Sequence, residues 1–152
     1  KMYDQLVDIE AIKQLKYRYL RTLDLREWAD FAECFVPDAT GAYDGREFTD
    51  RDSLVAFMRE NMTDGLISMH QAHHPEIEVN GDQATGTWYL HDKVMVPEFE
   101  YLLEGAAFYS DTYVRTPAGW RIKRTGYRRT FEMSWSSKDL PSLRIKNQRL
   151  EG

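Results

Sequence analysis

Residues 9–24 read IEAIKQLKYRYLRTLD, and this pattern predicts the helix on which the rest of the chain is built. Apolar side chains recur at steps of three or four and so share one helical face: Leu6, Ile9, Ile12, Leu15, Tyr19 and Leu23. The basic residues Lys13, Lys16, Arg18 and Arg21 are expected on the opposite, solvent-facing side. The phenol of Tyr19 therefore enters an apolar environment, where its hydroxyl group needs a hydrogen-bond partner. The helix ends at a carboxylate, Asp24.

The carboxylate at the end of this helix has a structural interpretation and a chemical one. Residues Asp24 to Glu27 have the form D-x-x-E, a capping box that would open a second helix running from Trp28 through Phe35 and ending at Pro37. In that case Asp24 accepts a backbone N–H, a contribution of about 1 kcal/mol to stability. In the chemical interpretation its side chain orients a catalytic group. This segment alone leaves both interpretations open.

The segment after the second predicted helix indicates a short strand and a third helix. Residues 38–44 are typical of a strand and carry Tyr43. The third helix is expected to begin at a cap formed by Thr49 or Asp50 and to end shortly before Gly65.

From residue 67 the hydrophobic pattern changes its period from 3.6 to 2, which predicts strands. The expected strands cover roughly residues 67–79, 83–96, 101–116 and 120–133. Short turn signals separate them, so they should form an antiparallel meander. Pro75 interrupts the first of these strands and predicts a bulge or bend there.

Helices followed by a curved meander predict an α+β fold. We expect a cone-shaped, curved antiparallel sheet with the N-terminal helices over its concave face, an arrangement that encloses a pocket for a small apolar molecule. Residues 1–152 are expected to form a single domain, with a core at about residues 8–132 and a polar tail at residues 134–152.

Composition and charge restrict the class of protein. The chain has 152 residues, 42% of them hydrophobic, which is enough for one compact domain with a core. Its net charge of −5 argues against nucleic-acid binding, which needs a clustered positive field. No apolar run approaches the roughly 18 residues of a membrane span. The single cysteine, Cys34, fits a reducing compartment, so we expect a cytoplasmic protein without nucleic-acid or membrane partners.

Three histidines lie close together at His70, His73 and His74, with His91 on the next predicted strand. Zinc needs three or four converging ligands, whereas one strand face offers at most two of these histidines and no thiolate is near. We therefore expect no metal. For His73, His74 and His91 we expect ordinary solvated or hydrogen-bonded side chains.

His70 differs from the other histidines because the predicted fold brings the end of the first helix opposite it. A carboxylate at Asp24 that accepts the Nδ1 hydrogen would fix the imidazole tautomer, raise its basicity and leave Nε2 free to remove a proton. The phenols of Tyr19 and Tyr43 could then donate to a carbonyl group or to a departing oxygen.

Other chemistries have little support in the sequence. It contains no G-x-S-x-G, P-loop or G-x-G-x-x-G motif, so a serine nucleophile and a nucleotide cofactor are not expected. Cys34 falls on the apolar side of a predicted helix, which favours a core position. Residues 126–129 read GYRR, and an alternating strand must direct one of the two arginines inward. An inward Arg129 would need an acidic partner or an anionic ligand.

Several segments of the chain resemble a known family. They are residues 8–16 (DIEAIKQLK) with Tyr19 and Leu23-Asp24, residues 67–70 (ISMH) with 75–77 (PEI), residues 84–90 (ATGTWYL), residues 105–109 (GAAFY), and residues 125–127 (TGY) with Arg129. On these segments the chain resembles the SnoaL-like branch of the nuclear transport factor 2-like superfamily, most closely the bile-acid 7α-dehydratases. Scytalone dehydratase and a dehydrochlorinase are more distant relatives.

The resemblance implies a site, a reaction and an assembly. The implied catalytic residues are His70, Asp24, Tyr19 and Tyr43, and the implied substrate-binding residues are Arg129, Trp88, Tyr89 and Phe108. The resemblance also implies an elimination without a cofactor, and a homo-oligomer, a trimer or a dimer, formed through the open sheet face. Residues 97–103 and the tail after Met133 depart from the dehydratase pattern.

The activity expected from these residues is a dehydration. His70, oriented by Asp24, would remove a proton from a carbon next to a carbonyl group. Water would leave from the neighbouring or vinylogous carbon of a hydroxylated polycyclic substrate, either steroid-like or polyketide-like. Two alternatives stay open: an isomerase like ketosteroid isomerase, which loses no water, and a non-catalytic protein that binds small molecules.

Overall fold

The structure is a computed structural model that describes residues 2–150. Its helices are α1 (Met2–Leu25), α2 (Trp28–Glu33) and α3 (Arg51–Asn61), and its strands are β1 (Phe35–Tyr43), β2 (Arg46–Phe48), β3 (Ile67–Asn80), β4 (Gln83–Val96), β5 (Tyr101–Thr116) and β6 (Gly119–Ser136). Short 3-10 turns lie at Pro97–Phe99, Ser137–Asp139 and Gln148–Leu150. No helix within residues 2–150 is both long and apolar enough to cross a membrane.

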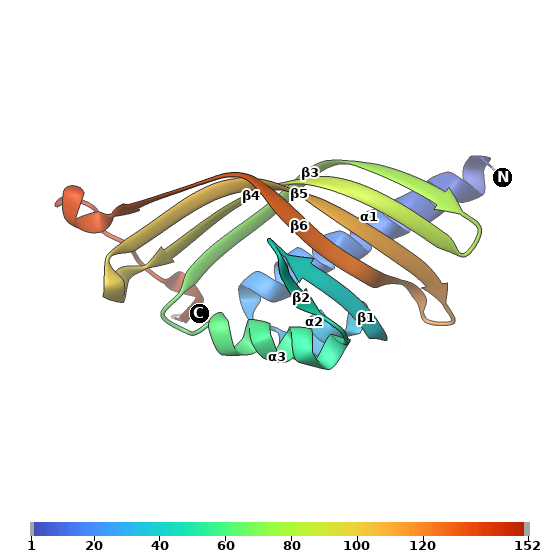
Figure 1. Cartoon of the computed structure of the whole chain (residues 1–152), viewed down its shortest axis with the longest axis horizontal. Helices are drawn as coiled ribbons and strands as arrows, with labels where there is room; N and C mark the ends of the chain where they lie inside the picture. The colour runs from blue at the N-terminus through green and yellow to red at the C-terminus, as the bar shows by residue number, and fades with distance from the viewer. Residues whose placement is uncertain (1, 151–152) are drawn as a thin grey trace.

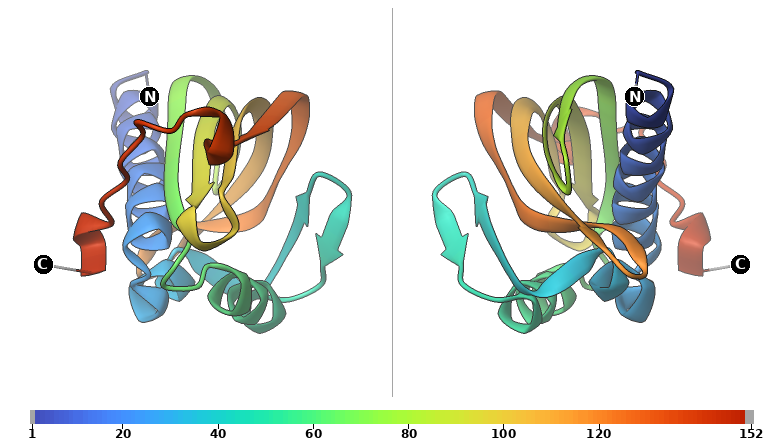
Figure 2. Two further views of the ribbon diagram at one scale, coloured as in Figure 1. Left: turned by 90° about the vertical axis from the view of Figure 1, so that its left-hand side faces the viewer. Right: turned by 90° about the vertical axis from the view of Figure 1, so that its right-hand side faces the viewer.

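The six strands form one curved, open sheet in the order β2-β1-β6-β5-β4-β3 (Figure 1). In end-on views α1 stands against β3 at one side of the curve, while α2 and α3 lie across the open side toward β1 and β2 (Figure 2). The predicted α+β fold with a curved sheet and N-terminal helices is therefore confirmed. The helices and the concave face of the sheet enclose the hydrophobic core between them.

One strand pair departs from the predicted antiparallel arrangement. β1 runs parallel to β6, with Gly41 opposite Thr125 and Tyr43 opposite Tyr127. All other neighbouring strands are antiparallel. A tight turn can join only antiparallel strands, but about half of the chain lies between β1 and β6, so no turn constrains their direction. The prediction of a wholly antiparallel sheet is wrong at this pair.

The helix α1 is longer than predicted, and two of its side chains are not buried or exposed as predicted. It begins at Met2 rather than Ile9, and Leu6, predicted on the apolar face, is 59% exposed. Lys16, predicted on the solvent-facing side, is fully buried. Its Nζ lies 2.8 Å from Oδ2 of Asp111 on β5. A hydrophobic pattern cannot indicate such a burial, because it depends on an ion pair with a distant strand.

The second helix ends earlier than predicted. α2 stops at Glu33, and residues Phe35 to Pro37 belong to β1. The backbone carbonyl of Cys34 accepts a hydrogen bond from the N–H of Ile122 at 2.8 Å, which joins the chain to β6 at this point. Pro37 also disfavours the helical conformation in the residue before it, Val36. Phe35 still enters the core, but from a strand.

The third helix and the four long strands match the predictions within a few residues. α3 begins after the predicted cap Asp50, whose side chain accepts a backbone N–H. The predicted bulge at Pro75 is confirmed by a shift in the β3–β4 register between His73 and Glu76. His74 takes a positive φ of 30° at this point. The bulge changes the direction of the edge strand next to α1.

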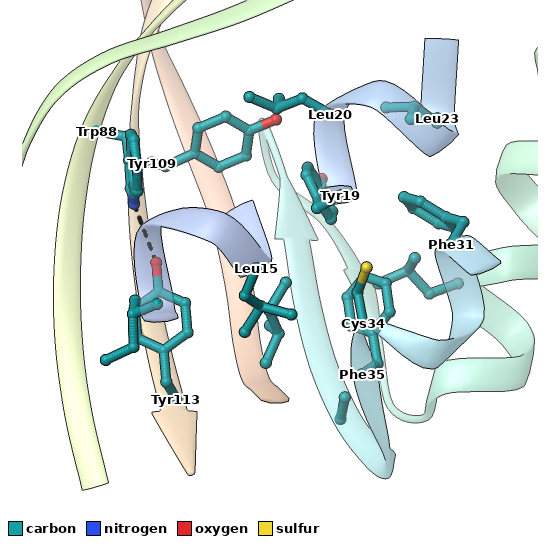
Figure 3. Packing of buried hydrophobic residues seen from close by; sticks show 14 of the residues in the cluster. Leu15, Tyr19, Leu20, Leu23, Phe31, Cys34, Phe35, Trp88, Tyr109 and Tyr113 are labelled. Carbon is teal, nitrogen blue, oxygen red and sulfur yellow. Dashed lines mark hydrogen bonds between the residues drawn. The ribbon is translucent and has the colours of Figure 1, made fainter. Parts of the chain in front are cut away.

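Aromatic side chains from the helices and the sheet fill the core (Figure 3). The ring of Tyr19 on α1 lies 5.2 Å from the ring of Phe31 and 6.0 Å from that of Tyr109, measured between centroids. Trp88 Nε1 donates to the hydroxyl group of Tyr113 at 3.0 Å. The contact of Tyr19 with Tyr109 joins α1, and with it the acid at the end of the helix, to the sheet.

Candidate active site

The carboxylate at the end of α1 contacts the histidine on β3. Oδ1 of Asp24 lies 2.7 Å from Nδ1 of His70, and Oδ2 accepts the backbone N–H of the same residue at 2.8 Å. The two side chains are 21% and 14% exposed, respectively. The contact between the end of the first helix and His70 that the sequence predicts is therefore present.

The other interpretation of Asp24, as a helix cap, does not hold. Asp24 lies inside α1, which ends at Leu25. Glu27 is the N-cap residue of α2, and no side-chain hydrogen bond caps that helix. Arg26 takes a left-handed φ of 62° between the two helices. The D-x-x-E pattern is therefore not a capping box in this protein, and the carboxylate is free to bind His70.

The partner of Nδ1 determines where the imidazole carries its hydrogen. A carboxylate only accepts hydrogen bonds, so neutral His70 carries its hydrogen on Nδ1 and a lone pair on Nε2. Hydrogen bonding to the acid also restricts the orientation of the ring. The pair therefore has the arrangement of a general base with an orienting acid.

Ser68 and Arg26 hold the carboxylate in place. The hydroxyl group of Ser68 donates to Oδ1 of Asp24 at 2.8 Å, and Nη1 of Arg26 donates to the Ser68 oxygen at 2.9 Å. The same guanidinium group donates to the backbone carbonyls of Leu66, at 2.7 Å, and Met62, at 3.0 Å. The loop before β3 and the end of α1 are thus joined through one arginine beside the acid.

The sequence interpretation did not identify Ser68, although strand alternation could have found it. Ser68 precedes His70 by two residues on β3, so both side chains project from the same face. Asp92 was missed in the same way, since it lies on the same face of β4 as the buried residues Trp88 and Leu90. A polar residue at an inward position of a strand is the signal in both cases.

The phenols of Tyr19 and Tyr43 form a hydrogen-bonded pair. Tyr19 comes from α1 and Tyr43 from the end of β1, and their hydroxyl oxygens are 2.7 Å apart. Burial raises the pKa of both phenols above its usual value, so both groups are protonated near neutral pH. One hydroxyl group must donate to the other. The phenol of Tyr109 also interacts with that of Tyr19, so the pair lies in a buried group of three tyrosines.

Arg129 faces the concave side of the sheet and is bound by acids. Its Nη1 and Nη2 each lie 2.8 Å from an oxygen of Asp92, and its Nε lies 3.0 Å from Oε1 of Glu132. The hydrogen bonds that Arg129 donates to Asp92 raise the pKa of Arg129 above its usual value. Asp92 is opposite His70 in the β3–β4 register. An anionic ligand would have to share the guanidinium group with these two carboxylates.

Two of the aromatic residues expected around the substrate lie on the wrong face of the sheet. Tyr89 and Phe108 are 38% and 40% exposed, and their rings pack on each other with centroids 4.2 Å apart. On β4, Tyr89 alternates with the inward residues Leu90 and Trp88. The prediction that Tyr89 and Phe108 line a concave pocket is therefore corrected. Trp88 does face inward, but it is buried in the core beneath α1.

The other histidines and the cysteine have structural surroundings. Nε2 of His91 lies 2.7 Å from Oε2 of Glu104, and His73 and His74 are exposed. Within residues 2–150, no group of three or more His, Cys, Asp or Glu side chains is arranged to hold a metal ion. Burial raises the pKa of the Cys34 thiol to about 11, which leaves little thiolate near neutral pH.

A groove of about 370 Å³ between α1 and β3 reaches the acid–histidine pair from outside. Asp24 and His70 lie at its floor, and Tyr17, Arg21 and His73 belong to its lining. Solvent therefore has access to the pair along this groove, which gives a proton removed by the histidine a route to water.

The fold and the acid–histidine pair define an NTF2-like α+β protein with a candidate general base. The sequence model of the SnoaL-like domain matches residues 4–126, so the chain belongs to the SnoaL-like domain family. An uncharacterised protein of Mycobacterium tuberculosis is 27% identical over 127 residues, which cover 79% of this chain and 84% of that relative.

Solved structures with similar folds include two proteins named for eliminations. A scytalone dehydratase-like protein of Novosphingobium aromaticivorans has a TM-score of 0.82 at 21% identity, covering 89% of this chain and 92% of that protein. A hexachlorocyclohexane dehydrochlorinase of Novosphingobium barchaimii, LinA-type3, has a TM-score of 0.81 at 17% identity, with coverage of 96% and 99%. At these identities the likeness establishes the fold that the chains share.

Proposed function

We propose that the protein is a dehydratase, a carbon–oxygen lyase whose proton transfers are carried out by side chains without a cofactor. The observation that carries this proposal is the 2.7 Å contact between Asp24 and Nδ1 of His70. Nε2 of His70 removes a proton from a carbon next to a carbonyl group, and the released electron pair forms the new carbon–carbon double bond. The hydroxyl group on the neighbouring or vinylogous carbon takes a proton from the phenol of Tyr43 or from solvent and leaves as water, and a phenolate formed in this way regains its proton from solvent. The protonated histidine then returns its proton to solvent.

The phenol pair supplies the hydrogen-bond donor in this reaction. Tyr19 is fully buried and Tyr43 is 7% exposed, and we assign the role of donor to the substrate to Tyr43, which lies at the end of its strand. Its hydroxyl group stabilises the negative charge that develops on the carbonyl oxygen, or protonates the leaving hydroxyl group. General-base assistance contributes typically about 10² to 10⁴ in rate, and positioning of the substrate supplies more.

The proposed substrate is a hydroxylated, carbonyl-bearing polycyclic molecule, steroid-like, bile-acid-like or polyketide-like. The eliminations named for two proteins with the same fold support a lyase. Arg129 is proposed to bind a polar group of the substrate together with its acid partners. An isomerase of the ketosteroid type would use the same phenol pair as a donor to the oxyanion. Its product would have the same mass as the substrate, because isomerisation loses no water.

Substitution of the pair tests the proposal directly. We expect His70→Ala and Asp24→Asn to abolish dehydration while the protein stays folded, because one removes the base and the other its orienting charge. His91→Ala is the matched control, since this histidine also contacts an acid, Glu104, at 2.7 Å but lies outside the site. Product mass after incubation with hydroxylated steroid or polyketide ketones measures the loss of water, and circular dichroism measures folding.

The outcomes of this experiment separate the candidate functions. Full activity in both His70→Ala and Asp24→Asn would refute the proposed mechanism. A product of unchanged mass that still requires His70 would identify an isomerase. Stoichiometric binding of the ketones without any turnover by the natural sequence would identify a non-catalytic binding protein.

A further inference from the structure

A buried ion pair that the proposed reaction does not use lies behind the phenol pair. Lys16 on α1 and Asp111 on β5 both have fully buried side chains, and their Nζ and Oδ2 atoms are 2.8 Å apart. The hydroxyl groups of Tyr113 and Thr125 each donate to the same carboxylate at 2.7 Å. The carboxylate therefore has three partners, drawn from α1, β5 and β6.

The ammonium group of Lys16 faces the rings of two tyrosines. Its Nζ lies 3.4 Å from the ring centroid of Tyr109 and 4.3 Å from that of Tyr19. Figure 3 shows these two tyrosines next to each other at the core. Within residues 2–150, Nζ of Lys16 is the buried side-chain atom without a well-directed hydrogen bond. The carboxylate and the two ring faces therefore offset its charge.

Stability alone does not account for this ion pair. Taking two charges out of water costs several kcal/mol per ion, and replacement of such a pair by apolar side chains of similar volume is often neutral or stabilising. Burial lowers the pKa of Lys16, while its contact with Asp111 opposes that change and favours the charged form. The carboxylate thus keeps a positive charge beside the tyrosine rings.

Tyr19 connects this charge to the phenol assigned as the donor to the substrate. Its ring lies over the ammonium group, and its hydroxyl oxygen is 2.7 Å from that of Tyr43. Either hydroxyl group could donate in this pair, and the role proposed for Tyr43 requires Tyr19 to donate to the Tyr43 oxygen, so that the hydrogen of Tyr43 is left for a ligand. A hydrogen bond of this kind becomes stronger when a cation polarises the donor ring.

We propose that Lys16 is a positioning residue for the elimination, which acts through Tyr19 to make the phenol of Tyr43 a stronger hydrogen-bond donor. The proposal rests on the function proposed above for Tyr43. The property that it predicts is the acidity of one phenol, and that acidity can be measured in the protein without any substrate.

The experiment measures the pKa of the phenol at position 43. Tyr43 is replaced with a polyfluorinated tyrosine, because fluorination makes the phenol acidic enough to titrate while the protein is folded. The absorbance of its phenolate is followed with pH. We expect Lys16→Met to raise this pKa by about one unit, the size of a desolvated cation–π contact. Lys16→Arg should keep the original pKa because it keeps the charge. Lys13→Met, on the same helix but with its side chain only partly buried, is the matched control and should also leave the pKa unchanged.

An unchanged pKa in folded Lys16→Met would overturn the proposal, as would an equal rise in Lys16→Arg or in Lys13→Met. If Lys16→Met does not fold, Lys16→Gln repeats the test with the same expectation, because its amide can still donate to Asp111 without carrying a charge. The measurement is independent of turnover. A raised pKa in a protein that catalyses nothing would support the role of Lys16 and refute the proposed dehydration.

Once a substrate is known, the separate changes in kcat and KM give a second readout. Lys16→Met should lower kcat about tenfold and leave KM nearly unchanged, because the stronger donor acts on charge that develops in the transition state. A rise in KM at constant kcat would overturn this part of the proposal.

Discussion

The carboxylate of Asp24 accepts three hydrogen bonds, which have two different consequences. Two of their donors, Nδ1–H and the backbone N–H, belong to His70, and the third is the hydroxyl group of Ser68. The Nδ1 bond orients the base, whereas the other two bonds keep the carboxylate from rotating. Replacement of the imidazole therefore leaves the acid in place, which makes single substitutions at this site interpretable.

The contribution of Ser68 can be measured. We expect Ser68→Ala to lower kcat several-fold, because the carboxylate loses one of the bonds that define its orientation. Stability should fall by about 1 kcal/mol, the usual net value of one hydrogen bond. Ser110→Ala, at an exposed position of β5, is the control. Steady-state kinetics and urea unfolding are the measurements, and equal kcat values for the two variants would contradict the expectation.

Predictions for single residues succeed where the feature depends on nearby sequence, and they fail where it depends on a contact with a distant segment. The contact of Asp24 with His70 follows from a helix that ends beside a strand, and both elements are evident from periodicity. The burial of Lys16 depends on Asp111, far along the chain, and no local pattern contains that information. The misassignment of Tyr89 has another cause. Consecutive side chains of a strand project from opposite faces, so Tyr89 must lie on the outer face when its neighbour Leu90 faces the core.

At the scale of elements, the meander could be predicted and the helix–strand junction could not. β3 to β6 are bounded by turns with strong residue signals, such as Asn80-Gly81, and their periodicity is sustained. Phe31 and Phe35 are both buried. They are four residues apart, and that spacing places two side chains on one face of a helix or on one face of a strand. The outcome depends on pairing with β6, a contact that the local sequence does not reveal.

The parallel pairing of β1 with β6 depends on a glycine. A Cβ atom at Gly126 would lie 2.5 Å from the carbonyl oxygen of Ala42, too close for the two strands to keep their distance. We expect Gly126→Ala to destabilise the protein by about 1–3 kcal/mol. It should also lower activity, because Tyr43 follows Ala42 on the displaced strand. Gly65→Ala is the control, since no atom lies within 4 Å of its Cβ position.

Denaturant unfolding and turnover measure the two effects of the Gly126→Ala substitution. A loss of stability with unchanged kcat would mean that Tyr43 keeps its position despite the displaced strand. Equal stability of the Gly126 and Gly65 variants would contradict the expected clash itself.

At the scale of the whole molecule, the outer face of the sheet carries an apolar surface. Its exposed members, Tyr89, Phe108, Phe131 and Met133, lie on β4, β5 and β6. The register confirms that they share a face, since Tyr89 is opposite Phe108, and Phe131 is opposite Ala106, two residues before Phe108. Apolar surface of this kind often marks a protein–protein interface.

We expect the protein to be a homo-oligomer, with a trimer favoured over a dimer, assembled through this face. Light scattering after size exclusion measures the molar mass in solution. Phe108→Glu should shift it toward that of a single chain, since a buried charge without a partner opposes association. Glu47→Gln, an exposed position on β2, should leave the molar mass unchanged. A single-chain mass for the natural sequence would refute the expectation.

The parallel pairing of β1 and β6 also determines the order in which the site can assemble during synthesis. β1 emerges early from the ribosome, but among residues 2–150 its long partner strand is β6, which follows about 75 residues later, and contacts between such distant segments form slowly. Asp24 and His70 can meet once β3 is made. The phenol of Tyr43 is fixed beside Tyr127 only when β6 follows. A nascent chain that stops after β5 therefore carries the base and its acid, but lacks the strand that orients the donor.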